Sequence, residues 1–532
     1  MSAGAALMGG RLAAPNDLLW GEGAHAPSRS MTLPDSATAL RATYEAALHC
    51  LKGNVVNVFQ FPSPVLTEGA VYHGVWLECA PQEGLVYSEY DPAVGRANHD
   101  VFFQTQREDG YIHCSIKPTT MGAGQIQMVV PIAATALELY HQKIHASQFL
   151  EDAYKSCWRW DDWLVRYRNT RGTGLCEGFC TYDTGHDHSP RWAGVPSQCP
   201  QADARLAPRG VGVPRLCPDL SATVFGGRIA LAKMARIMGR NDEADAWEEK
   251  AEHIRELIVA RLYDPDVACF FDRDIDNKFV RVRGDALTRV LGEHVVDQSM
   301  FQEIYRKQIH NPNAFWAPYP LPSIALDDPA FVRPIPRNSW GGATQALTAL
   351  RAPRWMEHYG KPADLTHMMK QWHIAMLRVP GFFAQQMDPL TGEFTVKDGG
   401  GYSPAALVLL DYTWRLYGVR EQDGELEWNC RTPAAQGEAV FELRTASGGA
   451  RLVHAGGKSS LFLKGKNILT VEGTARIVSD RYGKPLRVVG TENEEVVCKL
   501  HYPNGSTGVL RVAPNAVVKT GSGVGHFQPV GQ

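Results

Sequence analysis

The chain has 532 residues, of which 44% are hydrophobic and 21% are charged, and its formal net charge is −3. This composition is typical of a globular protein with more than one folding unit. Without a basic excess, nucleic acid and anionic membrane surfaces are not expected as partners. A neutral or mildly polar ligand fits the charge balance better.

The first 36 residues are rich in Gly, Ala, Pro and Ser, and we expect an N-terminal arm (residues 1–36) that lies loosely on the surface. Its start lacks the basic residues and the long apolar core of a signal peptide. No run of 18 apolar residues occurs, so no membrane span is expected. The 11 cysteines are scattered and odd in number, which favours reduced, mostly buried thiols. Together these features predict a cytoplasmic protein.

From about residue 37 to 420 the apolar residues recur at helical spacing. Helices come in pairs joined by short turns, and Asn241 and Asp242 are N-cap candidates for the second helix of one pair. Long loops rich in Pro, Gly and aromatic residues separate some pairs, at 171–220 and 310–340. Such loops on a rigid helical frame are commonly functional. We predict helices at 37–52, 129–145, 221–239, 242–263, 296–308, 343–359, 363–378 and 404–417.

After about residue 421 the pattern changes to alternating apolar and polar residues between Gly, Asn and Pro turns. The sequence PNGS at 503–506 is typical of a hairpin turn. Residues 421–532 are therefore predicted to form a small antiparallel β-domain, similar to a sandwich.

The segment 171–192, RGTGLCEGFCTYDTGHDHSPRW, gathers acids, histidines and aromatic residues in one Gly-punctuated loop. An aromatic face packs on the apolar face of a pyranose. A partly desolvated carboxylic acid keeps its proton to higher pH and can protonate a leaving oxygen, so this combination suits sugar chemistry. The residues of interest are Glu177, Tyr182, Asp183, His186, Asp187, His188, Arg191 and Trp192.

Within this segment, TGHDHSPRW resembles the S-G-x-D-x-S-x-R-W segment of inverting (α/α)6-barrel glycoside hydrolases. These comprise trehalase, processing-type α-glucosidases and the mannosylglycerate and glucosylglycerate hydrolases. The resemblance implies an (α/α)6 toroid barrel over residues 37–420, with Asp187 as the general acid. The preceding GTGLCEGF is similar to their G-x-G-L-x-E-x-G and places Glu177 on the substrate. Asp183 falls where the relatives often carry Glu.

Three later segments resemble the same hydrolases in the same order, so the resemblance covers roughly residues 40–420. The segment 315–331 is similar to the loop before their W-x-G segment. The segment 335–360 is similar to that W-x-G segment, which makes Trp340 a sugar platform. The segment 382–418 is similar to their closing stretch. Tyr402 lies in it, and for Tyr402 sugar stacking and packing are weighed evenly.

The closing stretch departs from the pattern at Gln385, where the relatives carry the glutamate that acts as general base. An amide has no basic lone pair at neutral pH and cannot deprotonate water. Three explanations stay open. Another carboxylate supplies the base, with Glu393 the best candidate and Asp388 a weaker one. Gln385 replaces a native glutamate by engineering. Alternatively, this branch keeps only the sugar-binding frame.

The sequence D-x-x-H-D-H around Asp187 invites a metal site. The relatives need no catalytic metal, and histidines two residues apart in a loop are more often hydrogen-bonded, so no metal and no cofactor are expected. Three tryptophans in CWRWDDW, namely Trp158, Trp160 and Trp163, lie on a predicted helix, where core packing is the default.

These features together predict an inverting hydrolase of a small soluble glycoside, α-linked by resemblance, with a small carbohydrate as its partner. Inversion places the acid and the base roughly 6.5–9.5 Å apart. A rival is a sugar isomerase, epimerase or lyase on the same barrel, which uses His186 or His188 as acid and base. A second rival is a catalytically altered carbohydrate-binding relative. A homo-oligomer stays open.

Overall fold

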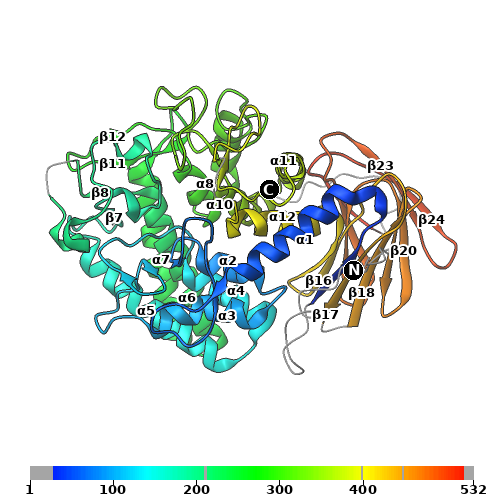
Figure 1. The fold of residues 1–532 in the computed structure, drawn as a ribbon, viewed down its shortest axis with the longest axis horizontal. Helices are drawn as coiled ribbons and strands as arrows, with labels where there is room; N and C mark the ends of the chain where they lie inside the picture. The colour runs from blue at the N-terminus through cyan, green and yellow to red at the C-terminus, as the bar shows by residue number, and fades with distance from the viewer. Residues whose placement is uncertain (1–27, 209–211, 397–399, 446–447, 521–532) are drawn as a thin grey trace, which may run out of the picture.

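The computed structural model describes residues 28–208, 212–396, 400–445 and 448–520. Within these ranges twelve α-helices precede most of the strands of two antiparallel sheets (Figure 1). The helices fill one side of the molecule and the two sheets lie beside them at the other end. No helix in the described part of the chain is long and apolar enough to cross a membrane.

Six helices contact one another in chain order and close into a ring, because the last of them also packs against the first. They bury most of their residues, as helices that are covered on every side do. The ring consists of α2 (Ala80–Tyr87), α4 (Ile132–Leu139), α6 (Pro218–Ile237), α8 (Ala286–Gly292), α10 (Ala346–His358) and α12 (Ser403–Tyr417).

The remaining helices alternate with the ring helices along the chain, and most of them pack against a ring neighbour. Helix α7 packs against α6 along its length, and α3 does the same on α2. In α5 and α7 the buried apolar residues recur at helical spacing on one side of the helix. The helices that alternate with the ring helices are α1 (Thr38–Gly53), α3 (Pro92–Gln104), α5 (Ser147–Tyr167), α7 (Asn241–Leu262), α9 (Gln298–Ile304) and α11 (Pro362–Leu377).

The helices predicted from apolar spacing are present, with ends that shift by a few residues; two of them, α4 and α9, pass into π-turns within the predicted span. One local prediction is wrong. The N-cap of α7 is Arg240, and Asn241 is already the first helical residue, without a capping hydrogen bond from a side chain. The short helices α2 and α8 and the Pro-initiated α3 were not predicted, because their windows are too short or too evenly buried to show a helical period.

Two antiparallel sheets follow the helices (Figure 1). The larger has the order β1-β17-β18-β19-β20-β23-β24, and the smaller has the order β15-β16-β21-β22-β25. The hairpin predicted at PNGS joins β23 and β24, whose residues pair from Val496–Val512 to His501–Thr507. The strands are β15 (Val419–Gln422), β16 (Glu425–Asn429), β17 (Ala439–Thr445), β18 (Gly448–Ala455), β19 (Lys458–Leu463), β20 (Lys466–Glu472), β21 (Arg476–Asp480), β22 (Pro485–Val489), β23 (Val496–His501), β24 (Thr507–Val512) and β25 (Val517–Lys519).

The expected loose arm is contradicted at its C-terminal end. Residues Arg29–Thr32 form strand β1, which pairs antiparallel with β17 at the edge of the larger sheet. Met31 is buried there, and the guanidinium of Arg29 lies 5.0 Å from the centre of the Trp414 ring. Alternation in the four residues RSMT is too brief to distinguish a strand from a loop. The prediction for residues 1–27 lies outside the described residues.

Short paired strands hold the loops between the helices together. Four of them form one sheet in the order β12-β11-β8-β7, which holds both ends of the 171–220 loop. They are β7 (Glu177–Gly178), β8 (Arg215–Leu216), β11 (Asp272–Arg273) and β12 (Phe279–Val280); the others are β2 (Val55–Val56), β3 (Val65–Leu66), β4 (Val75–Trp76), β5 (Ser115–Ile116), β6 (Met121–Gly122), β9 (Tyr263–Asp264), β10 (Cys269–Phe270), β13 (Thr344–Gln345) and β14 (Gln386–Met387).

Candidate active site

The loop that carries Asp187 is fixed by backbone hydrogen bonds. The amides of Thr181 and Tyr182 donate to the carbonyls of Pro196 and Ser197, which closes the loop on itself. The carbonyl of Asp187 accepts a hydrogen bond of 3.0 Å from the amide of Trp340, which comes from a distant part of the chain. The position of Asp187 is therefore set from both sides.

The side chain of Asp187 is half-buried and faces Gln385 through one intermediary, Asn338. The Asn338 amide donates to Asp187 Oδ2 at 3.0 Å, and Asn338 Oδ1 accepts from Gln385 Nε2 at 2.9 Å. Both hydrogen bonds are made by the same Asn338 amide group, so Asp187 Oδ2 and Gln385 Nε2 are at most roughly 8 Å apart. The hydroxyl of Tyr72 donates to Gln385 Oε1 at 3.0 Å, which fixes the orientation of that amide.

Burial raises the pKa of Asp187, while the hydrogen bond from Asn338 and the nearby His188 lower it in part. The net effect is upward, because desolvation disfavours the charged carboxylate. Asp187 therefore keeps its proton to higher pH than an exposed aspartate, as a general acid requires.

Two glutamates outside every predicted motif, Glu68 and Glu78, also interact electrostatically with Asp187. Burial raises the pKa of Glu68 to about 8; the charges of Glu83 and Asp187 add to this, and a hydrogen bond of 2.7 Å from the Tyr402 hydroxyl opposes it. Burial, followed by the charges of Glu68 and Asp187, holds the pKa of Glu78 well above its usual range. These carboxyl groups cannot all be ionised at neutral pH.

Glu78 and Glu68 place carboxylate oxygens within 4.8 Å of each other but have different neighbours. Glu78 packs against the Asp187 loop at Gly185, where an added Cβ would lie 1.6 Å from Glu78 Oε2. Gly185 also has a positive φ of 62°, so this close approach requires glycine. Glu68 instead lies beside Tyr402, whose ring centre is 6.0 Å from that of Tyr72, the partner of Gln385.

Aromatic side chains border the polar cluster. Tyr72 packs edge-on against Trp76 with ring centres 5.8 Å apart, and both side chains are half-buried. Tyr182 is also half-buried, and burial together with the charge of Asp187 raises its pKa. Half-buried aromatic rings beside carboxyl groups offer the combination of apolar face and hydrogen-bonding groups that a sugar ring uses.

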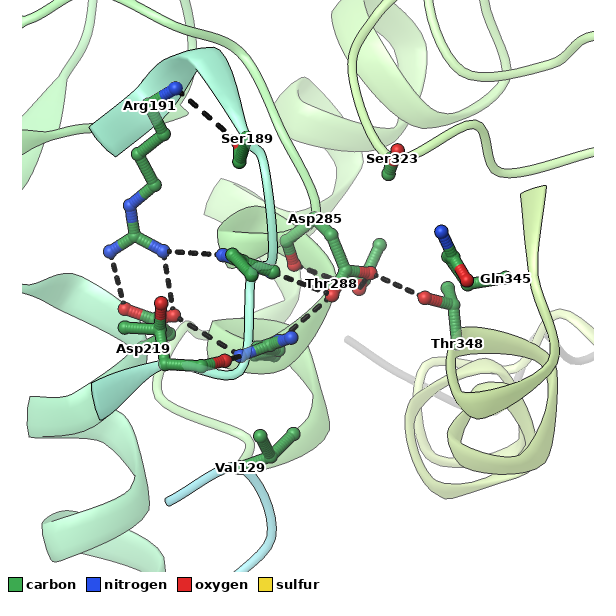
Figure 2. Close-up of polar contacts among 12 residues, drawn as sticks. Val129, Ser189, Arg191, Asp219, Asp285, Thr288, Ser323, Gln345 and Thr348 are labelled. Atoms are coloured by element: carbon green, nitrogen blue, oxygen red, sulfur yellow. Dashed lines mark hydrogen bonds and ion pairs between the residues drawn. The ribbon is translucent and has the colours of Figure 1, made fainter. Parts of the chain in front are cut away.

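Beneath the Asp187 loop lies a buried polar network (Figure 2). Arg191 makes two hydrogen bonds to Asp219, of 2.8 and 2.7 Å, and it also pairs with Asp272. Asp285 accepts hydrogen bonds from Thr288 at 2.7 Å and from Thr348 at 2.8 Å. The network ties the loop to α6, α8 and α10 of the helix ring, and so holds Asp187 on a rigid support.

His186 belongs to this network. Its Nδ1 accepts a hydrogen bond from Arg191 at 3.0 Å, and its Nε2 lies 3.3 Å from the Asp285 carboxylate. Burial, followed by the charge of Arg289, lowers the pKa of His186 to about 3. The ring also packs on Trp340, with centres 4.9 Å apart. Both ring nitrogens are therefore occupied within the protein.

Several residues predicted to contact substrate are buried with partners inside the protein, so their substrate contacts stay predictions. Glu177 accepts hydrogen bonds from Thr170 and Arg171. Asp183 pairs with Arg168 at 2.5 and 3.0 Å. Trp192, Trp340 and Tyr402 are likewise buried, together with His186 and Arg191 above.

The structure does not bring the predicted base candidates to Asp187. The Glu393 side chain is exposed, and no hydrogen bond or ion pair of that side chain is found within the described residues. Asp388 caps a turn at the amide of Leu390 and pairs with Arg333 at 3.1 Å. His188 is exposed, with a positive φ of 55°. Among the described residues of the closing stretch, Gln385 is the one linked to the Asp187 side chain, through Asn338.

Four residues of the site were missed by the sequence analysis, namely Glu68, Tyr72, Glu78 and Asn338. Glu68, Tyr72 and Glu78 lie more than 100 residues before Asp187 and outside the quoted motifs. Asn338 lies within the quoted segment 335–360, next to the conspicuous Trp340. Its φ is positive, 45°, a conformation in which asparagine is common, but this becomes visible only in the folded chain.

Three groups of side chains within the described ranges place possible metal-binding atoms within 4.8 Å of one another. In two of them the carboxylates already pair with arginine: Asp183 with Arg168, and Asp219 and Asp272 with Arg191. The third consists of Glu68, Glu78 and Cys79 and coincides with the carboxyl cluster.

Comparison with known proteins places this arrangement in context. The family model of the mannosylglycerate hydrolase MGH1-like glycoside hydrolase domain matches residues 85–414. The GH63 mannosylglycerate hydrolase from Thermus thermophilus, solved in complex with Tris, is 18% identical; the match covers 70% of this chain and 100% of that chain, with a TM-score of 0.59.

Two further solved structures share the fold. The neutral trehalase from Saccharomyces cerevisiae is 14% identical over 71% of this chain and 80% of that chain, with a TM-score of 0.51. The GH78 family rhamnosidase of Bacillus sp. GL1 is 13% identical over 82% of this chain and 40% of that chain, with a TM-score of 0.55. At these identities the likeness concerns the fold alone.

Proposed function

Because the chain belongs to the family of mannosylglycerate hydrolase MGH1-like glycoside hydrolase domains, we propose that it hydrolyses a small soluble, α-linked glycoside with inversion. In this proposal the ring of helices is the (α/α)6 barrel of these hydrolases, and the sheets after residue 421 are a β-domain attached to it. Asp187 is the general acid that protonates the glycosidic oxygen.

One observation carries the proposal: Asp187 and position 385 face each other through Asn338 at no more than roughly 8 Å. An inverting glycosidase leaves roughly 6.5–9.5 Å between its acid and its base, so that a water molecule fits between the base and the sugar. The limit of roughly 8 Å to position 385 is compatible with room for that water. The raised pKa of Asp187 supports its role as the acid. The position opposite holds an amide, so Gln385 can orient the water but cannot deprotonate it.

For the base we propose Glu68. The Tyr402 hydroxyl holds its carboxyl group, and the centre of the Tyr402 ring lies 6.0 Å from that of Tyr72, which donates to Gln385. Glu78 has no such link to Gln385 among the described contacts and packs against the loop of the acid at Gly185. A pKa of about 8 makes Glu68 a stronger base than an exposed carboxylate once it has lost its proton.

The two roles need Asp187 to be protonated while Glu68 is ionised, and both carboxyl groups have raised pKa values. Because like charges repel, loss of the proton from either group raises the pKa of the other, and the pair titrates as a unit. The singly ionised form with the proton on Asp187 is the one that glycoside hydrolysis uses.

The isomerase rival needs two histidines free to exchange protons with a sugar. His186 is buried with both ring nitrogens occupied, and its pKa is lowered to about 3. His188 is exposed and has no second free histidine as a partner among the described residues of this loop. These observations favour hydrolysis over isomerisation. The binding-only rival gains support from a single feature, the amide at position 385.

The test is a panel of small α-glycosides, including mannosylglycerate, glucosylglycerate and trehalose, assayed with the native chain and four variants. We expect Asp187→Asn to abolish hydrolysis and Glu68→Gln to reduce it about 100-fold or more, as removal of a general base does. Gln385→Glu should restore activity to the Glu68→Gln chain, because it places a carboxylate opposite the acid. The double variant Glu68→Gln/Gln385→Glu is therefore decisive.

Proton NMR of the first product anomer distinguishes inversion from retention. If Asp187→Asn retains full activity, the acid assignment falls. If Glu68→Gln is fully active, another group is the base. If neither the native chain nor Gln385→Glu hydrolyses any glycoside but sugars still bind, the chain is a carbohydrate-binding relative.

A further inference from the structure

The three tryptophans of helix α5 have different surroundings. Trp160 and Trp163 stack on each other in the core with ring centres 5.3 Å apart, as predicted. Trp158, for which core packing was also expected, is 47% exposed, and no other tryptophan in the described ranges is as exposed. That expectation is wrong for Trp158, because position 158 falls outside the apolar stripe of the helix.

Trp158 borders a surface hollow of about 460 Å³ between α5 and the start of α7. This volume falls within the range of small-molecule sites, roughly 300–1,000 Å³. Tyr154 and Trp247 line the hollow as well. Tyr154 lies four residues before Trp158, and residues at this spacing share one face of a helix. No residue of the hollow belongs to the cluster around Asp187.

The polar groups in the hollow are held in place by one another. Trp247 donates to the Tyr154 hydroxyl at 3.0 Å, and that hydroxyl donates to Glu243 at 2.5 Å. Arg240 makes two hydrogen bonds of 2.7 Å to Glu151 and lies over the Tyr154 ring, 5.4 Å from its centre. These groups form a polar floor that is already ordered before any ligand arrives.

Besides these paired groups, the hollow has two lysines whose ammonium groups could bind a ligand. Lys155 and Lys250 are exposed at its rim, and no hydrogen bond or ion pair of either ammonium group is found within the described residues. Lys250 also lies 4.3 Å from the centre of the Trp247 ring. The charges around the hollow are of both signs and nearly balanced, which does not favour a strongly charged ligand.

We propose that this hollow is a second saccharide-binding site, in which the exposed face of Trp158 packs on a sugar ring and the surrounding charged groups bind its hydroxyls. An exposed aromatic face next to fixed donors and acceptors of both kinds matches a molecule with one apolar face and many hydroxyl groups. The site goes beyond the proposed hydrolysis, since it needs none of the groups around Asp187. It would hold a longer saccharide on the enzyme surface.

The experiment measures binding of four neutral oligosaccharides, maltoheptaose, cellohexaose, mannohexaose and xylohexaose, by titration calorimetry at millimolar concentrations. The full-length Asp187→Asn chain is used, so that the ligands are not consumed. Trp158→Ala removes the platform and Trp158→Phe keeps an aromatic ring. Val165→Ala is the matched control, because Val165 is 49% exposed on the same helix and lies outside the hollow.

We expect at least one oligosaccharide to bind, with a Kd that rises about tenfold or more in Trp158→Ala, a smaller rise in Trp158→Phe and no change in Val165→Ala. Hydrolysis of a short glycoside by the otherwise native Trp158→Ala chain should be unchanged. The proposal is overturned if no member of the panel binds, or if Trp158→Ala binds every ligand as tightly as Val165→Ala does. Loss of hydrolysis in the native chain with this binding intact would refute the proposed function alone.

Discussion

The Asn338 side chain donates a hydrogen bond of 3.0 Å to the carboxyl group of Asp187 and, with its other atom, accepts one of 2.9 Å from Gln385. Asn338 therefore sets both the direction of the Asp187 carboxyl group and its distance from position 385. Neither role was visible in the sequence, where Asn338 is one polar residue in a Pro- and Arg-rich loop.

Replacement of Asn338 by alanine should reduce kcat/KM about 10- to 100-fold, because a displaced acid protonates the leaving oxygen poorly. The variant should also raise the pKa of Asp187, since the lost hydrogen bond lowers it in the native chain. The alkaline limb of the kcat/KM profile should then move to higher pH. Asn313→Ala, in an exposed part of the neighbouring loop, is the control and should change neither quantity.

The pH profile of the native chain should reveal the unusual base. If Glu68, with a pKa of about 8, must be ionised, kcat/KM should still be rising between pH 6 and about 8. In Gln385→Glu a half-exposed carboxylate can take over, and the acid limb should move to lower pH. An acid limb that is the same in both chains would argue against Glu68 as the base.

Buried Glu83 should make stability depend on pH. Burial raises its pKa from about 4.5 to about 8, and the charge of Glu78 adds to this. Below pH 4.5 both the folded and the unfolded chain hold this proton, so the contribution is complete. As the pH rises towards 8 only the folded chain retains it, and the free energy of unfolding should fall by up to about 1.4 kcal/mol per pH unit.

Denaturant unfolding of Glu83→Gln between pH 5 and 8 checks this. An amide stays neutral, so the variant should lose the part of the slope that Glu83 causes and should be the more stable chain at pH 8. Glu108→Gln, at an exposed position, serves as the control and should follow the native chain. Identical slopes in the native and Glu83→Gln chains would show that Glu83 is not protonated in the fold.

Arg191 neutralises two buried aspartates, Asp219 and Asp272, each 2% exposed or less. Arg191→Met would leave Asp272 without its charge partner and Asp219 with only Arg289, 3.6 Å away, and should destabilise the chain by about 3–5 kcal/mol. Arg205→Met breaks the exposed pair with Asp203 and should cost at most about 1 kcal/mol. Similar shifts of the unfolding midpoint in urea for the two variants would contradict this reading of the network.

The helical frame could be predicted because long helices with one apolar face leave a clear period, as in α1 and α7. The strands after residue 421 were visible for the same reason, with a period of two. Short ring helices such as α2 and α8 were missed, since burial on all sides removes the period.

Within the site, the sequence singled out Asp187 and Gln385, which the structure does bring to face each other. Asp183 and Arg191, which it also singled out, each form ion pairs inside the fold, and their substrate contacts stay predictions. A motif shows that a charged residue is required, but not whether its partner is a substrate or another side chain. It missed Glu68 and Glu78, because their importance depends on a low-dielectric environment that only the folded chain creates.

Strand β1 has a consequence for synthesis. Residues 29–32 leave the ribosome well before their partner, residues 440–443 of β17, which is made some 400 residues later. While the helices between β1 and β17 are being made, the β1 segment, which includes Met31, has no strand to pair with. Deletion of residues 29–32 should therefore lower the yield of correctly assembled chains, and a chaperone that shields this one segment would be of greatest use until β17 has been made.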